Sequence, residues 1–102
     1  MTDLSVVIPV YNEEASLPPL WSELREVLER LGLVYEVVFV DDGSRDRSAE
    51  IVRAFREADR RVRLVRLKVN GGETAATDAG FKVAQGRRVV VMDADQIGRA
   101  HV

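Results

Sequence analysis

Two aspartates separated by one residue, Asp93 and Asp95, follow a short apolar run near the end of the chain. A turn at this point would let both carboxylates reach one hard cation. Mg²⁺ and Mn²⁺ prefer oxygen ligands of this kind, and Mg²⁺ usually completes its coordination with water and substrate phosphates. The pair therefore predicts a metal site for a diphosphate, but an acidic turn that only ends a strand has the same pattern.

A second acidic turn, Asp41-Asp42-Gly43-Ser44, follows another apolar run. One of its carboxylates could accept a hydrogen bond from an N–H group of a nucleotide base, since a buried acceptor rejects a base that lacks the donor. The same residue types are common in turns and at the starts of helices. The residues alone leave both interpretations open.

Two more loops contain residues that suit a ligand. Tyr11 could support a base or a ribose beside Pro9, which restricts the loop, or it could simply pack. The following Asn12-Glu13-Glu14 could instead begin a helix whose first turn favours acidic residues. Gly71 and Gly72 either supply a positive φ angle or let a phosphate or sugar approach the N–H groups of a helix N-terminus.

Apolar periodicity predicts the elements that position these loops. Runs of apolar and β-branched residues predict four strands, over residues 4–10, 35–40, 62–69 and 89–92. Apolar steps of three and four residues predict three helices: residues 17–31 with Ser16 as the N-cap and Gly32 past the end, residues 49–58, and a segment between Asn70-Gly71-Gly72 and Gly86. Asn-Gly also suggests a hairpin, but the strong helix formers that follow favour a helix.

Alternation of strands and helices predicts an α/β fold. Such a fold has parallel strands, right-handed crossovers and helices on both faces of the sheet. Ligands of these sheets bind outside the carboxyl ends of the strands. Because each candidate loop follows a strand, we expect all four loops to meet at one edge.

Composition excludes several classes of function. The 102 residues are enough for one folded domain, and 15 Lys and Arg against 17 Asp and Glu give a net charge of −2, which does not favour nucleic acid as a partner. The chain has no cysteine and a single histidine, His101, so thiolate zinc sites and His-rich metal centres are excluded. Neither G-x-G-x-x-G after the first strand nor a P-loop motif is present. No apolar stretch approaches a membrane span, so we expect a cytoplasmic chain.

The order of these motifs resembles the family 2 glycosyltransferases, whose nucleotide-sugar-binding half has the GT-A fold. The matching segments are SVVIPVYNEEASL (5–17), VVFVDDGSRDRS (37–48), NGGETAATDAGFKVAQG (70–86) and VVVMDAD (89–95). The Asn-x-Gly-x-x-Ala-Ala opening of the third segment is similar to the subgroup that transfers a hexose to a polyprenyl phosphate, such as dolichol-phosphate mannosyltransferases. The resemblance implies a Rossmann-like GT-A half-domain with a parallel sheet of about four strands.

Site roles follow from this resemblance position by position. It implies a nucleoside site lined by Pro9, Tyr11, Asn12 and Glu13, with Asp41 near the base, Asp42 supporting that loop and Gly72 on the sugar side. It also implies that Asp93 and Asp95 hold Mg²⁺ or Mn²⁺ on the diphosphate of a nucleoside-diphosphate sugar. In this family the acceptor attacks the anomeric carbon directly with inversion, so no catalytic nucleophile is expected in this chain. The acceptor implied is a lipid phosphate, and the parent protein is expected at the cytoplasmic face of the membrane.

The sequence departs from the subgroup in two places. Val69 stands where a basic residue is common, and Glu73 stands where a neutral or basic side chain is usual, which weakens the expectation of phosphate contacts from this loop. After Asp95 the subgroup continues with Leu-Gln, whereas the last six residues here are what ATC GGA AGA GCA CAC GTC encodes, a string that matches a common sequencing adapter. We therefore expect residues 1–95 to be the nucleotide-sugar-binding part, residues 96–102 to be a non-native tail, and the fragment to be inactive by itself.

Two alternatives to a transferase remain open at this point. A phosphatase of the haloacid dehalogenase type also uses Asp-x-Asp after a strand, with the first Asp as nucleophile, but its motif follows the first strand rather than the fourth. The second alternative is a nucleotide-binding module without catalysis, which would need the four candidate loops only to bind its ligand.

Overall fold

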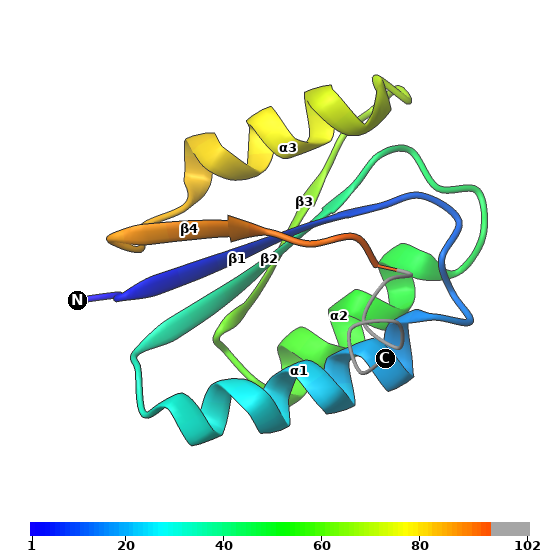
Figure 1. Cartoon of the computed structure of the whole chain (residues 1–102). Coiled ribbons are helices and arrows are strands. Elements are labelled where there is room, and N and C mark those ends of the chain that lie inside the picture. The colour runs from blue at the N-terminus through cyan, green and yellow to red at the C-terminus, as the bar shows by residue number, and fades with distance from the viewer. Residues whose placement is uncertain (95–102) are drawn as a thin grey trace.

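The computed structural model describes residues 1–94 (Figure 1). The predicted metal ligand Asp95 and the expected tail of residues 96–102 therefore lie outside the described residues.

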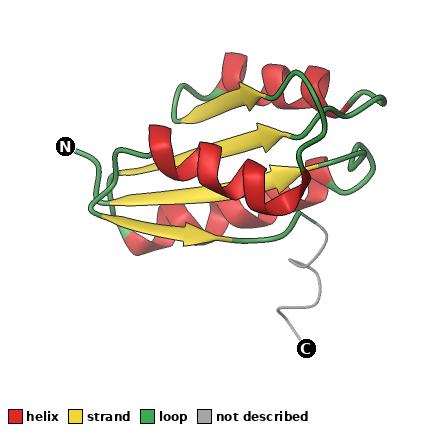
Figure 2. Ribbon diagram, turned by 90° about the horizontal axis from the view of Figure 1, so that it is seen from above, coloured by secondary structure: helices red, strands yellow, loops and turns green. Residues whose placement is uncertain are grey.

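Four parallel strands and three helices alternate along the chain. The strands are β1 (Leu4–Val10), β2 (Tyr35–Asp41), β3 (Val62–Arg66) and β4 (Arg88–Val91), and the helices are α1 (Leu17–Leu31), α2 (Ser48–Ala58) and α3 (Gly72–Val83). The strand order is β3-β2-β1-β4, and every neighbouring pair is parallel. Helices α1 and α2 cover one face and α3 covers the other (Figures 1 and 2). The predicted α/β fold with helices on both faces is confirmed.

The larger core lies between the sheet and helices α1 and α2. It forms because α1 turns one apolar stripe toward β1 and β2, and every residue of β2 is buried. Three rings meet there: Trp21 lies 5.8 Å from Phe55 and 6.3 Å from Phe39 between ring centroids. These contacts fix α1 and α2, and thus the loops that precede both helices.

The smaller core joins α3 to the opposite face of the sheet. Val7, Val38 and Val40 pack there against Ala76. Gly80 lies so close to the sheet that a Cβ atom on it would stand 2.3 Å from Cγ1 of Val7. The absence of a side chain at Gly80 is therefore what allows α3 to approach the sheet.

A buried carboxylate ties the amino ends of the strands together. Glu36 on β2 accepts hydrogen bonds from the Ser5 hydroxyl at 2.6 Å, the Gln85 N–H at 2.6 Å and the Arg63 guanidinium at 2.9 Å. Burial raises the pKa of Glu36, but the hydrogen bonds and the charge of Arg63 outweigh burial, so its pKa lies below the usual value. The same arginine donates to the Val83 carbonyl at 2.8 Å, which holds the end of α3.

Several element ends differ from prediction, and two of them by one residue: β2 ends at Asp41 rather than residue 40, and α2 begins at Ser48 rather than residue 49. The third strand ends at Arg66 rather than residue 69, because β2 has no further residue to pair with it once Asp42 turns away and donates to the Val10 carbonyl. The fourth strand spans 88–91 rather than 89–92, although the Met92 N–H still donates to the Val7 carbonyl. Helix α3 ends at Val83, so Gly86 is not its C-cap.

Strand β4 forms one edge of the described sheet and pairs only with β1 within residues 1–94. Its apolar residues Val89, Val90 and Val91 are exposed by 36%, 47% and 38%. Among the described residues, no helix combines the length and the hydrophobicity that a membrane crossing requires.

Candidate functional site

A cleft of about 420 Å³ opens at the carboxyl ends of the strands. All four strand-end loops contribute to its wall, which is lined by Pro9, Val10, Tyr11, Glu13, Asp42, Asn70, Gly72, Glu73, Asp93 and Ala94. The expectation that four loops distant in sequence meet at one edge of the sheet is therefore confirmed. This convergence follows from the parallel topology, because every strand ends at the same edge.

Most of the residues predicted for the site line this cleft. They are Pro9, Tyr11, Glu13, Asp42, Gly72 and Asp93. Asn12 and Asp41 are not part of the wall, and Asp95 lies outside the described residues. Asn70, Glu73 and Ala94 line the cleft but were not among the predicted site residues, although the first two lie in the loop that sequence motifs single out.

Asp42 fixes the start of helix α3. Its carboxylate accepts hydrogen bonds from the N–H groups of Gly71 at 2.8 Å and Gly72 at 2.9 Å. A carboxylate at this position satisfies two N–H groups near the start of the helix and interacts favourably with the helix dipole. The alternative in which these two N–H groups bind a ligand phosphate is wrong for this structure, because both already donate to Asp42. Gly72 adopts a φ of 90°, which explains a glycine here.

Asp41 has a different environment from its neighbour. Its side chain is buried, its carboxylate accepts a hydrogen bond from the Ser44 N–H at 3.2 Å, and Arg66 approaches it to 3.3 Å. Asp41 thus holds the β2–α2 turn and the end of β3, while Asp42 lines the cleft. The contact between Asp41 and a base stays a prediction.

Asn12 links the two loops on the β1 and β2 side of the cleft. It adopts a left-handed φ of 52°, an uncommon conformation that Asn tolerates better than most residues. Its N–H donates to the Ser44 hydroxyl at 2.9 Å, and its side-chain oxygen accepts from the Arg45 N–H at 2.9 Å. Asn12 therefore shapes the loop that presents Tyr11 and Glu13.

Two residues missed by sequence reasoning complete this link. The Ser48 hydroxyl accepts a hydrogen bond from the Glu13 N–H at 2.9 Å, and Asp46 accepts one from the Glu14 N–H at 3.2 Å. Asp46 also accepts from the Ser48 hydroxyl at 2.6 Å. Burial raises the pKa of Asp46, but hydrogen bonds from Ser48 and Glu14 lower it below the usual value. Both residues lie just before a predicted helix, where Asp and Ser are common as caps. The sequence therefore suggests a capping role and gives no sign of their hydrogen bonds to the loop after β1.

The cleft wall is acidic. It contains the carboxylates of Glu13, Asp42, Glu73 and Asp93, and none of the residues described in the wall is Lys, Arg or His. A diphosphate placed against this wall would be repelled unless a cation accompanied it. Within residues 1–94 no group of three or more acidic or histidine side chains is arranged to hold a metal. Asp93 is an oxygen donor of the kind that Mg²⁺ and Mn²⁺ take, and the ion would need substrate phosphates and water to complete its coordination.

The fold and the cleft define a Rossmann-like α/β unit that binds ligands at the carboxyl ends of its strands. Residues 5–97 match the family model of glycosyl transferase family 2, so the chain belongs to this family. This confirms the family that the motifs resemble, and neither the family nor an Asp-x-Asp after the fourth strand supports a haloacid dehalogenase-type phosphatase.

Curated relatives include transferases named for a polyprenyl phosphate, as in the predicted subgroup, although the sugar in their name is an arabinose derivative, a pentose, rather than a hexose. The chain is 52% identical over 93 residues to an undecaprenyl-phosphate 4-deoxy-4-formamido-L-arabinose transferase of Pseudomonas paraeruginosa, covering 90% of this chain and 27% of the relative. It is 44% identical over 91 residues to the uncharacterized glycosyltransferase YkcC of Bacillus subtilis, covering 89% and 28% of the two chains. The chain thus spans between a quarter and a third of the length of these relatives.

Solved GT-A glycosyltransferases share the fold. TarS residues 1–349 of S. aureus in complex with UDP-GlcNAc is similar, with a TM-score of 0.78 and 31% identity, covering 91% of this chain and 26% of the 1–349 chain. The mannosyltransferase PcManGT of Pyrobaculum calidifontis, in complex with GDP-Man and Mn²⁺, has a TM-score of 0.71 and 30% identity, covering 93% of this chain and 30% of PcManGT.

Proposed function

We propose that residues 1–95 form the donor-binding part of a glycosyltransferase that transfers a sugar from a nucleoside-diphosphate sugar to a polyprenyl phosphate. The observation that carries this proposal is the single cleft in which all four strand-end loops meet. Family membership supports glycosyl transfer, and the donor class is supported by neighbours solved with UDP-GlcNAc and GDP-Man. The acceptor class rests on relatives named undecaprenyl-phosphate transferases.

Within the cleft, we assign the nucleoside to the Pro9 and Tyr11 side. Tyr11 is 44% exposed and lines the cleft, so its ring is available for a base or ribose. Gly72 and Glu73 then lie toward the sugar. Asn12 holds the loop that contains Pro9 and Tyr11 through its hydrogen bonds with Ser44 and Arg45, so the nucleoside side of the site is preorganised.

We assign Asp93 and Asp95 to a divalent cation, Mg²⁺ or Mn²⁺, that accompanies the donor diphosphate. The acidic wall supports this assignment, because it disfavours a diphosphate without a cation. When bound, the ion neutralises the diphosphate and the leaving nucleoside diphosphate. Asp42 orients the loop of Gly71 and Gly72 at the same site, and transfer proceeds with inversion by direct attack of the acceptor. A protein with these substrates works at the cytoplasmic face of a membrane.

Calorimetric titration of the 102-residue chain with UDP and with GDP, each with and without Mn²⁺, tests the donor site. We expect binding of at least one nucleotide that depends on Mn²⁺ and is lost in Asp93→Asn. The matched control is Asp78→Asn, which removes one carboxylate from the exposed face of α3, where Asp78 forms an ion pair with Lys82. Nucleotide binding that is indifferent to Mn²⁺ and to Asp93→Asn would favour a binding module without metal-assisted transfer.

A further inference from the structure

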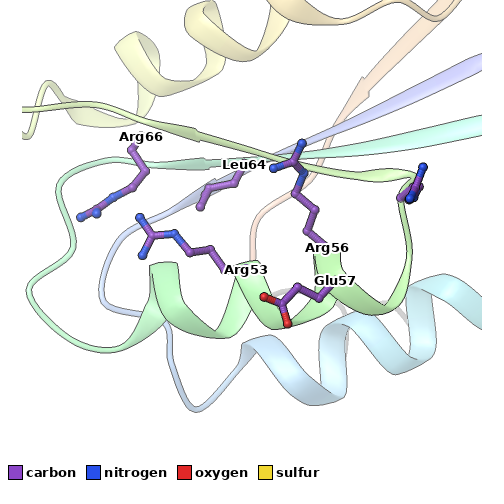
Figure 3. A pocket seen from close by; sticks show the side chains of 6 residues that line it. Arg53, Arg56, Glu57, Leu64 and Arg66 are labelled. Carbon is purple, nitrogen blue, oxygen red and sulfur yellow. The ribbon is translucent and has the colours of Figure 1, made fainter.

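A second and larger cavity shares no lining residue with the candidate donor cleft and lies on the flank of the molecule. It measures about 880 Å³ and lies between α2 and β3, the outermost strand on that side of the sheet. The residues that line it are Arg53, Arg56, Glu57, Arg60, Leu64 and Arg66. Figure 3 shows Arg53 and Arg56 extending from α2 toward β3, with Leu64 projecting between the strand and the helix. We call this cavity the arginine groove.

The charges in the arginine groove are not balanced within the protein. Arg53 and Arg56 lie three residues apart on α2, and Arg60 lies just beyond the end of this helix at Ala58. None of the three forms an ion pair with a described residue, and Glu57 does not either, whereas Arg61 and Arg63 are paired with acids. Like charges one turn apart on a helix, as at Arg53 and Arg56, are unfavourable, so an anion bound between them would remove an unfavourable interaction.

Guanidinium groups in this arrangement suit phosphate. Arginine binds phosphate oxygens through two parallel N–H bonds, and it remains charged at every physiological pH. Arg53 and Arg56 come from α2 and Arg60 from the turn that follows it, so the groove offers guanidinium groups at several positions and could contact more than one phosphate group. Leu64 and the methylene groups of the arginines add apolar surface beneath the charges.

The basic surface continues toward the donor cleft. Arg66 belongs to the arginine groove and also pairs with Asp41, the residue before Asp42 of the cleft. Beyond Arg66, a cavity of about 400 Å³ is lined by Gly43, Ser44, Arg66, Leu67 and Lys68. A surface that contacts the arginine groove therefore also reaches the edge of the sheet at which the donor cleft opens.

We propose that the arginine groove binds the phosphate headgroups of an anionic lipid surface. The choice of lipid rests on the proposed function, since a transferase with a lipid-phosphate acceptor must work beside a membrane. Contact through the flank of α2 and β3 would place the donor cleft beside the bilayer surface. The net charge of −2 opposes a nucleic acid duplex and an anionic membrane alike, so the choice between them rests on the proposed function, which includes a lipid phosphate and no nucleic acid.

Vesicle sedimentation of the full 102-residue chain tests this proposal. The vesicles are phosphatidylcholine alone and phosphatidylcholine with phosphatidylglycerol at a ratio of four to one. We expect binding to the anionic vesicles only, weakened by salt. Arg53→Gln together with Arg56→Gln should weaken binding roughly thirtyfold, from the attraction of each basic residue to an anionic leaflet. Replacement of both by Lys should retain most of it, since the charge remains.

The matched control is Arg87→Gln together with Arg88→Gln, which also changes the net charge from −2 to −4 but alters the opposite edge of the sheet. Its binding should stay within about twofold of the unmodified chain, because neither residue lines the groove. Circular dichroism and nucleotide titration verify that both variants fold.

Three results would overturn the proposal: equal losses in the two variants, equal binding to neutral vesicles, or competition by inorganic phosphate or DNA at the same phosphate concentration. A chain that binds nucleotide with Mn²⁺ but not anionic vesicles would refute the groove and leave the donor site intact. The reverse result would refute the donor site instead.

Discussion

Removal of the Asp42 carboxylate should destabilise the fold and disorder one wall of the cleft together. Asp42 is 4% exposed and accepts hydrogen bonds from two N–H groups at the start of α3. Asp42→Ala leaves both groups without this partner. Loss of a helix cap costs about 1 kcal/mol, and hydrogen bonds to a charged group contribute about 1.5–3 kcal/mol each. Because water in the open cleft can replace part of this, we expect a net loss of about 2 kcal/mol in the free energy of unfolding.

Urea unfolding followed by circular dichroism measures this loss. A domain of this size has a free energy of unfolding of about 5–15 kcal/mol, so the variant should remain folded and its midpoint should shift to lower urea. Asp42→Asn keeps one side-chain acceptor and should recover about half of the loss, since its amide NH₂ faces the second N–H group. Asp78→Asn, at an exposed surface pair of the same helix, should change the stability by less than about 0.5 kcal/mol.

Nucleotide titration of the same variants then separates packing from binding. If the Asp42 carboxylate positions the loop of Gly71 and Gly72, Asp42→Ala should also weaken nucleotide binding under conditions in which it is folded. A change below about 0.5 kcal/mol in the stability of Asp42→Ala would show that the two hydrogen bonds do not hold the loop, and the reasoning would be wrong.

Two further predictions concern the fold that carries the site. Glu36 has a pKa below its usual value of 4.5, so Glu36 takes up a proton in the unfolded chain before it does so in the folded chain as the pH falls. The free energy of unfolding measured in urea should therefore be full at neutral pH and decrease below about pH 4.5. Glu36→Gln should flatten this decrease. A Glu36→Gln variant with an unchanged pH profile would contradict this. Gly80→Val should destabilise the chain by about 3 kcal/mol or more in thermal unfolding, because its side chain would overlap Val7, whereas Ala79→Val, one residue away, should cost less.

The sequence predicts the elements well because their signals are local. The stripe of α1 and the apolar run of β1 gave boundaries that match the structure. Convergence of the loops also follows from local patterns, since alternating strands and helices leave parallel strands with all carboxyl ends on one side. The end of β3 was not predictable, because it depends on where β2 stops offering partners.

The different roles of Asp41, which pairs with Arg66, and Asp42, which lines the cleft, could not be predicted either. Successive residues at the end of a strand point to opposite faces, but the face that becomes the cleft is decided by contacts distant in sequence. Arg66 holds Asp41 on one side, and Gly71 and Gly72 draw Asp42 to the other. The hydrogen bond between Ser48 and the Glu13 N–H could not be predicted either, because it also joins residues distant in sequence.

The distribution of charge offers a physical reason for metal dependence of the proposed transfer. The cleft contains four carboxylates, while Arg53 and Arg56, which form no ion pair within residues 1–94, lie on α2. Between them, the Asp41–Arg66 ion pair is the contact at which basic and acidic surfaces meet. A cleft that binds a diphosphate without a cation would need basic side chains such as arginine in its wall, but the arginines of the arginine groove lie outside the cleft. Because the described wall offers carboxylates instead, we expect the proposed donor to bind together with a cation, and nucleotide affinity to depend on that cation more than on any basic side chain.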